Sequence, residues 1–102
     1  MVKLDCEIIM EYFRNEDFII SHHARSRMFQ RNVSTDDLKK IVQNSEIIES
    51  YPDDVPCPSV LLLGIVNDEP YHVVVAQCQD HARVITVYMP TKDKWHEDRI
   101  RM

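Results

Sequence analysis

The stretch that decides the fold is Val60-Leu61-Leu62-Leu63-Gly64-Ile65-Val66-Asn67-Asp68-Glu69-Pro70-Tyr71-His72-Val73-Val74-Val75-Ala76-Gln77. It contains two apolar runs, residues 60–66 and 71–77, and a polar segment over 67–70 that joins them. Runs of this length on either side of Asn, Asp and Pro are typical of two strands joined by a close turn. The stretch therefore predicts that an antiparallel meander forms the centre of the fold.

Two further strands are predicted on either side of this pair. Residues 47–51 form a short strand, and residues 83–89 form the last strand, which Pro90 ends. The segment 52–58 holds three prolines, which cannot donate to a sheet ladder, so it is predicted to be a loop. In the last strand, alternation places Val84, Thr86 and Tyr88 on one face.

The residues before the strands carry helical patterns. Residues 4–14 have apolar side chains at helical spacing, and Ser21 is a candidate N-cap for a helix over about residues 22–31. Ser34 and Asp37 resemble a capping box that opens a third helix. The segment 18–20 is short and apolar. The sequence therefore predicts an α+β fold, with two or three N-terminal helices packed on one face of an antiparallel sheet of about four strands.

The length and composition of the chain exclude several classes of protein. The chain has 102 residues, which predicts a single domain over 1–102, and its net charge of −5 excludes a uniformly basic nucleic-acid coat. A single glycine excludes a phosphate loop. No apolar run approaches the roughly 18 residues of a membrane span, and no secretory signal is evident, so a cytoplasmic protein is predicted.

Neither a disulfide nor a metal site is predicted. The three cysteines are an odd number and form no CxxC pair, which predicts reduced thiols that are buried or idle. The His and Cys residues show no ligand spacing, so we expect no metal and no cofactor. The charged C-terminal segment 92–102 is expected to be a short helix or a loose tail, with Trp95 as its anchor or as a stacking platform for a base.

The most unusual segment is residues 21–31, which holds two histidines and three arginines and no acid. On a helix, His23, Arg27 and Arg31 fall within an arc of about 80°. Arginine suits bidentate contact with phosphate, and histidine exchanges protons near neutral pH. The segment therefore predicts an anion-facing surface. The alternative is a solvated helix face whose arginines pair with acids on or beside the first predicted strand, namely Glu46, Glu49 or Asp53.

His72 is the second candidate for chemistry. By alternation it shares a strand face with Val74 and Ala76. One interpretation is a hydrogen-bonded histidine of the core or of a sheet edge. The other is that it faces the same cleft as His23. Two histidines and an arginine are sufficient for ribonuclease chemistry without a metal: one histidine takes the 2′-hydroxyl proton, the other protonates the leaving oxygen, and arginine stabilises the phosphate.

These residues resemble a known family. The pattern Ser21-x-His23-Ala24-x-x-Arg27-Met28-x-x-Arg31-Asn32-Val33-Ser34 is similar to the opening motif of the family called domain of unknown function 4258 (DUF4258). The similarity continues through Glu46-Ile47-Ile48-Glu49-x-Tyr51-Pro52, His72-Val73-Val74, Thr86-Val87-Tyr88-x-Pro90 and Trp95. Asn32 stands where the family usually has Gly, and Asn also tolerates a left-handed conformation.

The resemblance implies a small α+β fold similar to RelE- and ParE-type toxins, which act as endoribonucleases or gyrase poisons and are held inactive by an antitoxin. With the residues above, it predicts a metal-independent endoribonuclease toxin whose partners are RNA or the ribosome and an antitoxin protein. His23 and His72 would be the catalytic acid and base, and Arg27 and Arg31 the phosphate clamp. The alternative is a non-catalytic protein-interaction module with a structural His/Arg motif. No oligomeric state is predicted.

Overall fold

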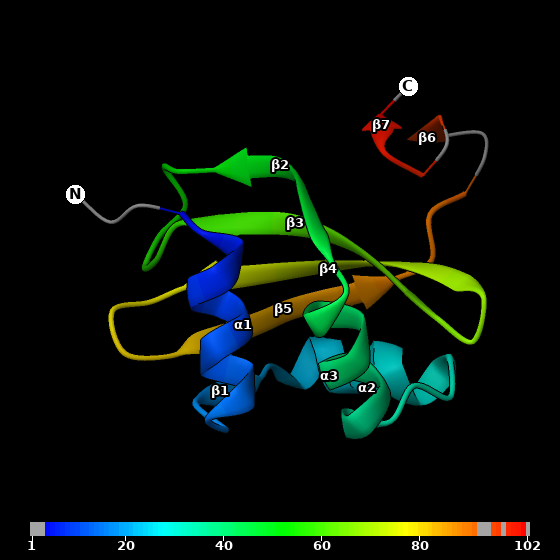
Figure 1. Ribbon diagram of the computed structural model, residues 1–102, viewed down its shortest axis with the longest axis horizontal. Helices are drawn as coiled ribbons and strands as arrows, with labels where there is room; N and C mark the ends of the chain where they lie inside the picture. The colour runs from blue at the N-terminus through cyan, green and yellow to red at the C-terminus, as the bar shows by residue number, and fades with distance from the viewer. Residues whose placement is uncertain (1–3, 92–94, 97, 102) are drawn as a thin grey trace.

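A computed structural model describes residues 4–91, 95–96 and 98–101 of the protein. Its centre is a five-stranded sheet with the strand order β1-β5-β4-β3-β2 (Figure 1). The strands are β1 (Phe18–Ile20), β2 (Glu46–Tyr51), β3 (Ser59–Val66), β4 (Glu69–Gln77) and β5 (Ala82–Tyr88). The strands from β2 to β5 pair antiparallel, as predicted. The short segment over 18–20 adds a fifth strand, which runs parallel to β5.

The turn between β3 and β4 is tighter than predicted. Asn67 and Asp68 both have positive φ angles, 54° and 64°, which these residue types tolerate better than most. The resulting register pairs Ser59 with Ala76. The same register, continued beyond the strands, brings Cys57 opposite Cys78. These two residues form a disulfide with a Cα–Cα distance of 5.2 Å, so the prediction of idle thiols is wrong for this pair.

A β-bulge in β5 changes the faces of its side chains. Val75 pairs with Val84, whereas Val74 pairs with Thr86, which leaves Ile85 as the additional residue. Because of this insertion, Val84 lies in the hydrophobic core, while Tyr88 lies opposite His72 on the other side of the sheet. The prediction that Val84 shares a face with Thr86 and Tyr88 is therefore wrong.

Three helices precede the antiparallel strands: α1 (Cys6–Arg14), α2 (His22–Gln30) and α3 (Thr35–Gln43). Ser21 caps α2 by accepting a hydrogen bond from the Ala24 amide at 3.1 Å. Ser34 and Asp37 form the predicted capping box at the start of α3. Asn32, with φ of 57°, reverses the chain between α2 and α3. The caps thus fix where α2 and α3 begin.

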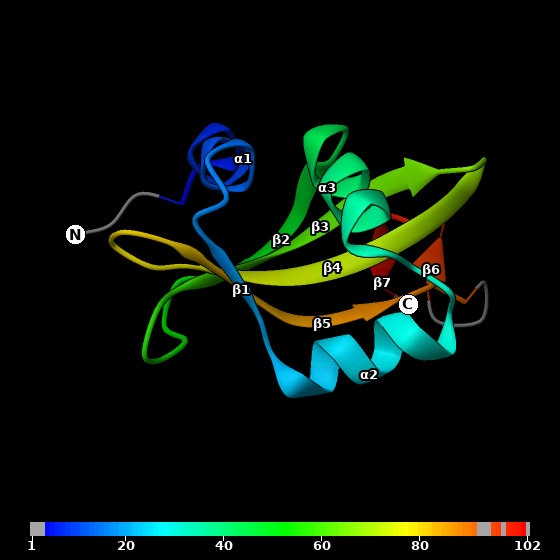
Figure 2. The same ribbon diagram turned by 90° about the horizontal axis from the view of Figure 1, so that it is seen from below.

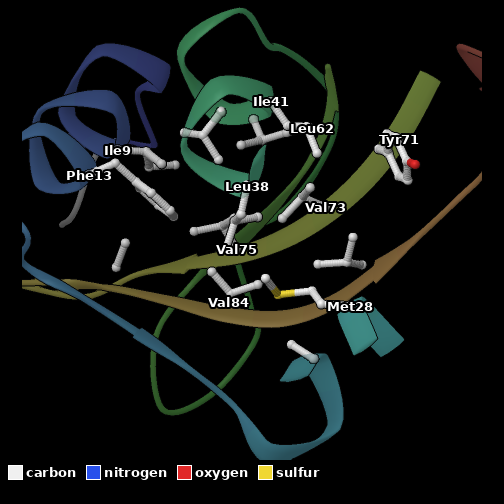
Figure 3. Close-up of a cluster of buried hydrophobic side chains, with 14 of the residues drawn as sticks. Ile9, Phe13, Met28, Leu38, Ile41, Leu62, Tyr71, Val73, Val75 and Val84 are labelled. Carbon is white, nitrogen blue, oxygen red and sulfur yellow. The ribbon is translucent and has the colours of Figure 1, made fainter. Parts of the chain in front are cut away.

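The helices do not all lie on one face. α1 and α3 cover one side of the sheet, whereas α2 runs along β5 at the edge (Figure 2). The core lies between these elements and the sheet (Figure 3). Each element contributes buried apolar side chains to it, such as Ile9 and Phe13 from α1, Ala24 and Met28 from α2, Leu38 and Ile41 from α3, and Val73 and Val75 from β4. We call this side of the sheet the helical face.

The opposite face of the sheet carries a small C-terminal hairpin of β6 (Trp95–His96) and β7 (Ile100–Arg101). The expected short helix or loose tail is therefore wrong for this part of the chain, and residues 92–94, 97 and 102 of that segment lie outside the described residues. Trp95 is 4% exposed, which agrees with a role as an anchor. Within the described part of the chain, no helix combines the length and the apolar character that crossing a membrane requires.

Candidate functional site

α2 presents a cationic face to solvent. His23, Arg27 and Arg31 are all exposed, as is Gln30 beside them. The buried residues of the helix are Ala24 and Met28. At 100° per residue, His23 and Arg27 project on one side of the buried pair, and Arg25 projects on the other. We call His23, Arg27, Gln30 and Arg31 the α2 face.

The contact made by Arg25 places one flank of α2 near α3. The Arg25 Nη1 donates to Thr35 Oγ1 at 2.9 Å, and Thr35 begins α3, which lies on the helical face of the sheet. Burial raises the pKa of Tyr71, and the charge of Arg31 opposes this, so the end of α2 with Arg31 also lies near a residue of the core. His72 and Tyr88 lie on the opposite face of the sheet.

The arginines of the α2 face have no carboxylate partners among the described residues. Two of the acids that could have paired with them bind other residues: Glu46 pairs with Arg99 at 2.7 Å, and Glu49 pairs with Arg101 at 3.1 Å. The alternative interpretation is therefore wrong in pairing Arg27 or Arg31 with Glu46 or Glu49, whereas the exposure of these arginines agrees with its solvated helix face. Asp53 is exposed and forms no ion pair within the described part of the chain either.

His72 is fully buried, with 0% exposure. Its Nε2 lies 2.6 Å from the carbonyl oxygen of Asp98, and because a carbonyl can only accept, Nε2 carries the hydrogen. Nδ1 then accepts from the Tyr88 hydroxyl at 3.2 Å. Burial lowers the pKa of His72, and this outweighs the opposing effect of the Asp98 carbonyl. The ring is therefore held in one neutral tautomer at neutral pH.

The hairpin closes over this histidine. The Trp95 ring meets the His72 ring edge-on, with centroids 4.4 Å apart. The Arg101 guanidinium lies 4.5 Å from the centroid of the Trp95 ring and also donates to Glu49. We call His72, Tyr88, Trp95, Arg101, Glu49 and Tyr51 the His72 cluster. It joins β2, β4 and β5 to the C-terminal hairpin.

Charge within the His72 cluster is balanced locally. The hydrogen bond from Arg101 holds the pKa of Glu49 below its usual value. Burial, together with a hydrogen bond to Glu49, raises the pKa of Tyr51 to about 12. The proximity of Glu49 and Tyr51 to His72 was not predicted from the sequence. Alternation in the first strand puts Glu49 and Tyr51 on one face, but nothing local showed that the C-terminal arginines would meet them.

The predicted site residues fall into two groups. His23 and Arg27 lie one turn apart on α2, and Arg31 is the C-cap residue of that helix; all three are exposed. The groups recorded around His72 belong to β2, β5 and the C-terminal hairpin, and none of the described residues of α2 is among them. A ligand on the α2 face reaches the His72 ring only if the hairpin leaves it. Across the described residues, no three His, Cys, Asp or Glu side chains converge as metal ligands.

Comparison with known proteins places these residues in a family. A family model described as "Domain of unknown function (DUF4258)" matches residues 20–89, a span that includes the α2 face and His72. No curated protein and no solved structure matches the chain. Because the matched span covers more than half of the sequence, the chain belongs to the DUF4258 family.

Proposed function

We propose that the protein binds RNA through the α2 face, with Arg27 and Arg31 in contact with phosphate groups. The observation that carries this proposal is that exposed arginines share one helix face with His23 and have no acid partner among the described residues. In a protein of net charge −5, such a face is a local cationic patch. One guanidinium group can donate two parallel hydrogen bonds to two oxygens of a phosphate. The negative charge of a phosphate backbone would also reduce the repulsion between Arg27 and Arg31.

The choice of RNA rests on the resemblance to RelE-type toxins, and cleavage is the activity that the same resemblance suggests. His23 is the exposed histidine of the face and is the proposed proton-transfer group. His72 is its proposed partner in a state in which the hairpin is displaced, because the closed hairpin keeps the ring from solvent. Binding is thus proposed for the closed structure, and metal-independent cleavage for the open one.

Binding is tested by fluorescence anisotropy with a short, labelled, single-stranded RNA in the presence of a chelator. Each charge-assisted contact stabilises a complex by about 1.5–3 kcal/mol, so Arg27→Gln and Arg31→Gln should each weaken binding about ten-fold or more. Arg25→Gln is the matched control, because Arg25 lies on the other flank of α2. Equal losses for Arg25→Gln and Arg27→Gln, or no binding by the unmodified protein, would overturn the proposal.

Cleavage is tested in the same buffer with and without ribosomes. General acid–base catalysis contributes about 10²–10⁴-fold to a rate, so His23→Ala should remove most of the activity while the melting temperature stays unchanged. His22→Ala is the control for an exposed neighbouring histidine. If neither condition yields cleavage, the catalytic part of the proposal fails. The anisotropy experiment still decides separately whether the protein binds RNA.

A protein partner is the second candidate function, and one observation favours it. Phe29 on α2 is 85% exposed, which is a large apolar surface to leave in water. An antitoxin-like protein that covers Phe29 would also reach Arg25, which precedes Phe29 by one helical turn. Co-expression with the product of the adjacent reading frame, followed by size-exclusion chromatography, tests this function. A complex that Phe29→Ser dissolves supports it, and separate elution of the two proteins contradicts it.

A further inference from the structure

A cavity of about 560 Å³ lies on the non-helical face of the sheet, away from the His72 cluster. Ala76 and Ile85 contribute its sheet side, and Val55 and Pro56 come from the loop that follows β2. The volume falls in the range of about 300–1,000 Å³ that is usual for small-molecule sites. The cavity shares no residue with the α2 face.

The cavity has one free charge. Arg83 lines it, is exposed, and has no carboxylate partner among the described residues. Two other polar side chains of the lining have partners within the protein: His81 Nδ1 pairs with Asp80 at 2.7 Å, and Ser21 Oγ donates to the Ile85 carbonyl at 3.0 Å. A ligand that complements this lining therefore needs one anionic group for Arg83 and an apolar body for the remainder.

Apolar surface is left in water at this cavity. Val55 is 89% exposed and Ile85 is 37% exposed, although both are large aliphatic residues. Isolated apolar side chains on a surface need no explanation, but here they border the same cavity as Arg83. An apolar ligand body would cover both side chains, and its removal from water would add to the affinity.

We propose that this cavity binds a small amphipathic carboxylate. The carboxylate accepts two hydrogen bonds from the Arg83 guanidinium, and the apolar body lies against Ile85 and Val55. Val55 and Pro56 form one wall of the cavity, and the position of this wall depends on the disulfide. The bond between Cys57 and Cys78 holds the loop that contains Val55 and Pro56 at the end of β4. A dithiol that reduces this bond yields two cysteine thiols and its own cyclic disulfide, and it frees the loop.

The probe for the test is 8-anilino-1-naphthalenesulfonate, which combines an apolar body with one anion and becomes fluorescent in apolar sites. We expect saturable binding at one site and displacement by octanoate. 1-Octanol has the same chain without the charge and should displace the probe about ten-fold less well, because it lacks the charge-assisted contact.

Two variants and a control for each assign the contacts. Arg83→Gln should raise the dissociation constant of octanoate about ten-fold or more and leave that of 1-octanol unchanged. Arg25→Gln, an exposed arginine on α2, is the matched control and should change neither constant. Cys57→Ser should weaken both ligands, whereas Cys6→Ser, at the cysteine outside the disulfide, should not. Circular dichroism confirms that each variant is folded.

Three results would overturn the proposal: a probe signal that octanoate does not displace, equal affinity for octanoate and 1-octanol, or an Arg83→Gln variant that binds octanoate as the unmodified protein does. Because the cavity and the α2 face share no residue, the anisotropy experiment with RNA is independent of this test. Failure of one proposal is therefore distinguishable from failure of the other.

Discussion

Replacement of His72 by alanine should release the C-terminal hairpin before the sheet unfolds. The change removes hydrogen bonds to Asp98 and Tyr88 and the edge-on contact with Trp95. Two hydrogen bonds at about 0.5–1.5 kcal/mol each and one aromatic contact at about 0.5–1.5 kcal/mol give a loss of about 1.5–4.5 kcal/mol. The cavity left by the ring adds to this loss.

The other contacts that hold the hairpin are weaker. Arg99 and Arg101 each pair with a glutamate on β2, but both arginine side chains are more than half exposed. Exposed pairs contribute about 0–1 kcal/mol each. His72 and the buried ring of Trp95 should therefore dominate the docking of the hairpin, and loss of the histidine should not be compensated by the ion pairs.

Intrinsic fluorescence measures this release, because Trp95 is the only tryptophan of the chain and is 4% exposed. In His72→Ala, the emission should shift to longer wavelength and acrylamide should quench it more strongly, at temperatures where far-ultraviolet circular dichroism is still native. His22→Ala, at an exposed position, is the control. If Trp95 stays protected in His72→Ala and stability changes by less than about 0.5 kcal/mol, the assignment of His72 as the anchor of the hairpin is refuted.

Three further predictions concern stability in urea melts. The pKa of His72 is lowered in the folded state, whereas in the unfolded chain it has the ordinary histidine value of about 6.5. Below that pH the unfolded chain binds more protons than the folded protein, so the free energy of unfolding should fall with acidification. The fall should be smaller in His72→Gln. Gly64→Ala would place a Cβ 2.3 Å from the Ile41 carbonyl oxygen and should cost about 1–3 kcal/mol or more. Reduction of the Cys57–Cys78 disulfide should cost about 2–4 kcal/mol, with Cys6→Ser as the neutral control.

The features that were predictable from sequence are those set by local contacts. Ser21 and Ser34 cap the helices that follow them, and the prolines of segment 52–58 keep that segment out of the sheet. The placement of His23 beside Arg27 was predictable because both residues belong to α2, so their relative directions follow from helical geometry, whereas Arg31 is the C-cap residue of that helix.

The features that were not predictable depend on contacts between distant segments. The strand β1 has three residues, too few to show a period, and it is a strand only because β5 lies beside it. The disulfide follows from the register, which depends on a turn of two residues rather than four. For His72, alternation correctly grouped it with Val74 and Ala76, but it could not show which face of the sheet they share or that Trp95 and the hairpin cover that face.

The measurement that tests the central claim most directly is the salt dependence of RNA affinity. For single strands, the logarithm of the binding constant falls with the logarithm of the salt concentration by about 0.7 for each phosphate neutralised. If Arg27 and Arg31 each contact a phosphate, each glutamine substitution should reduce the slope by about 0.7, and the double variant by about 1.4, relative to the unmodified protein. Arg25→Gln should leave the slope unchanged. A slope that is the same in the double variant and the unmodified protein would contradict phosphate binding by the α2 face.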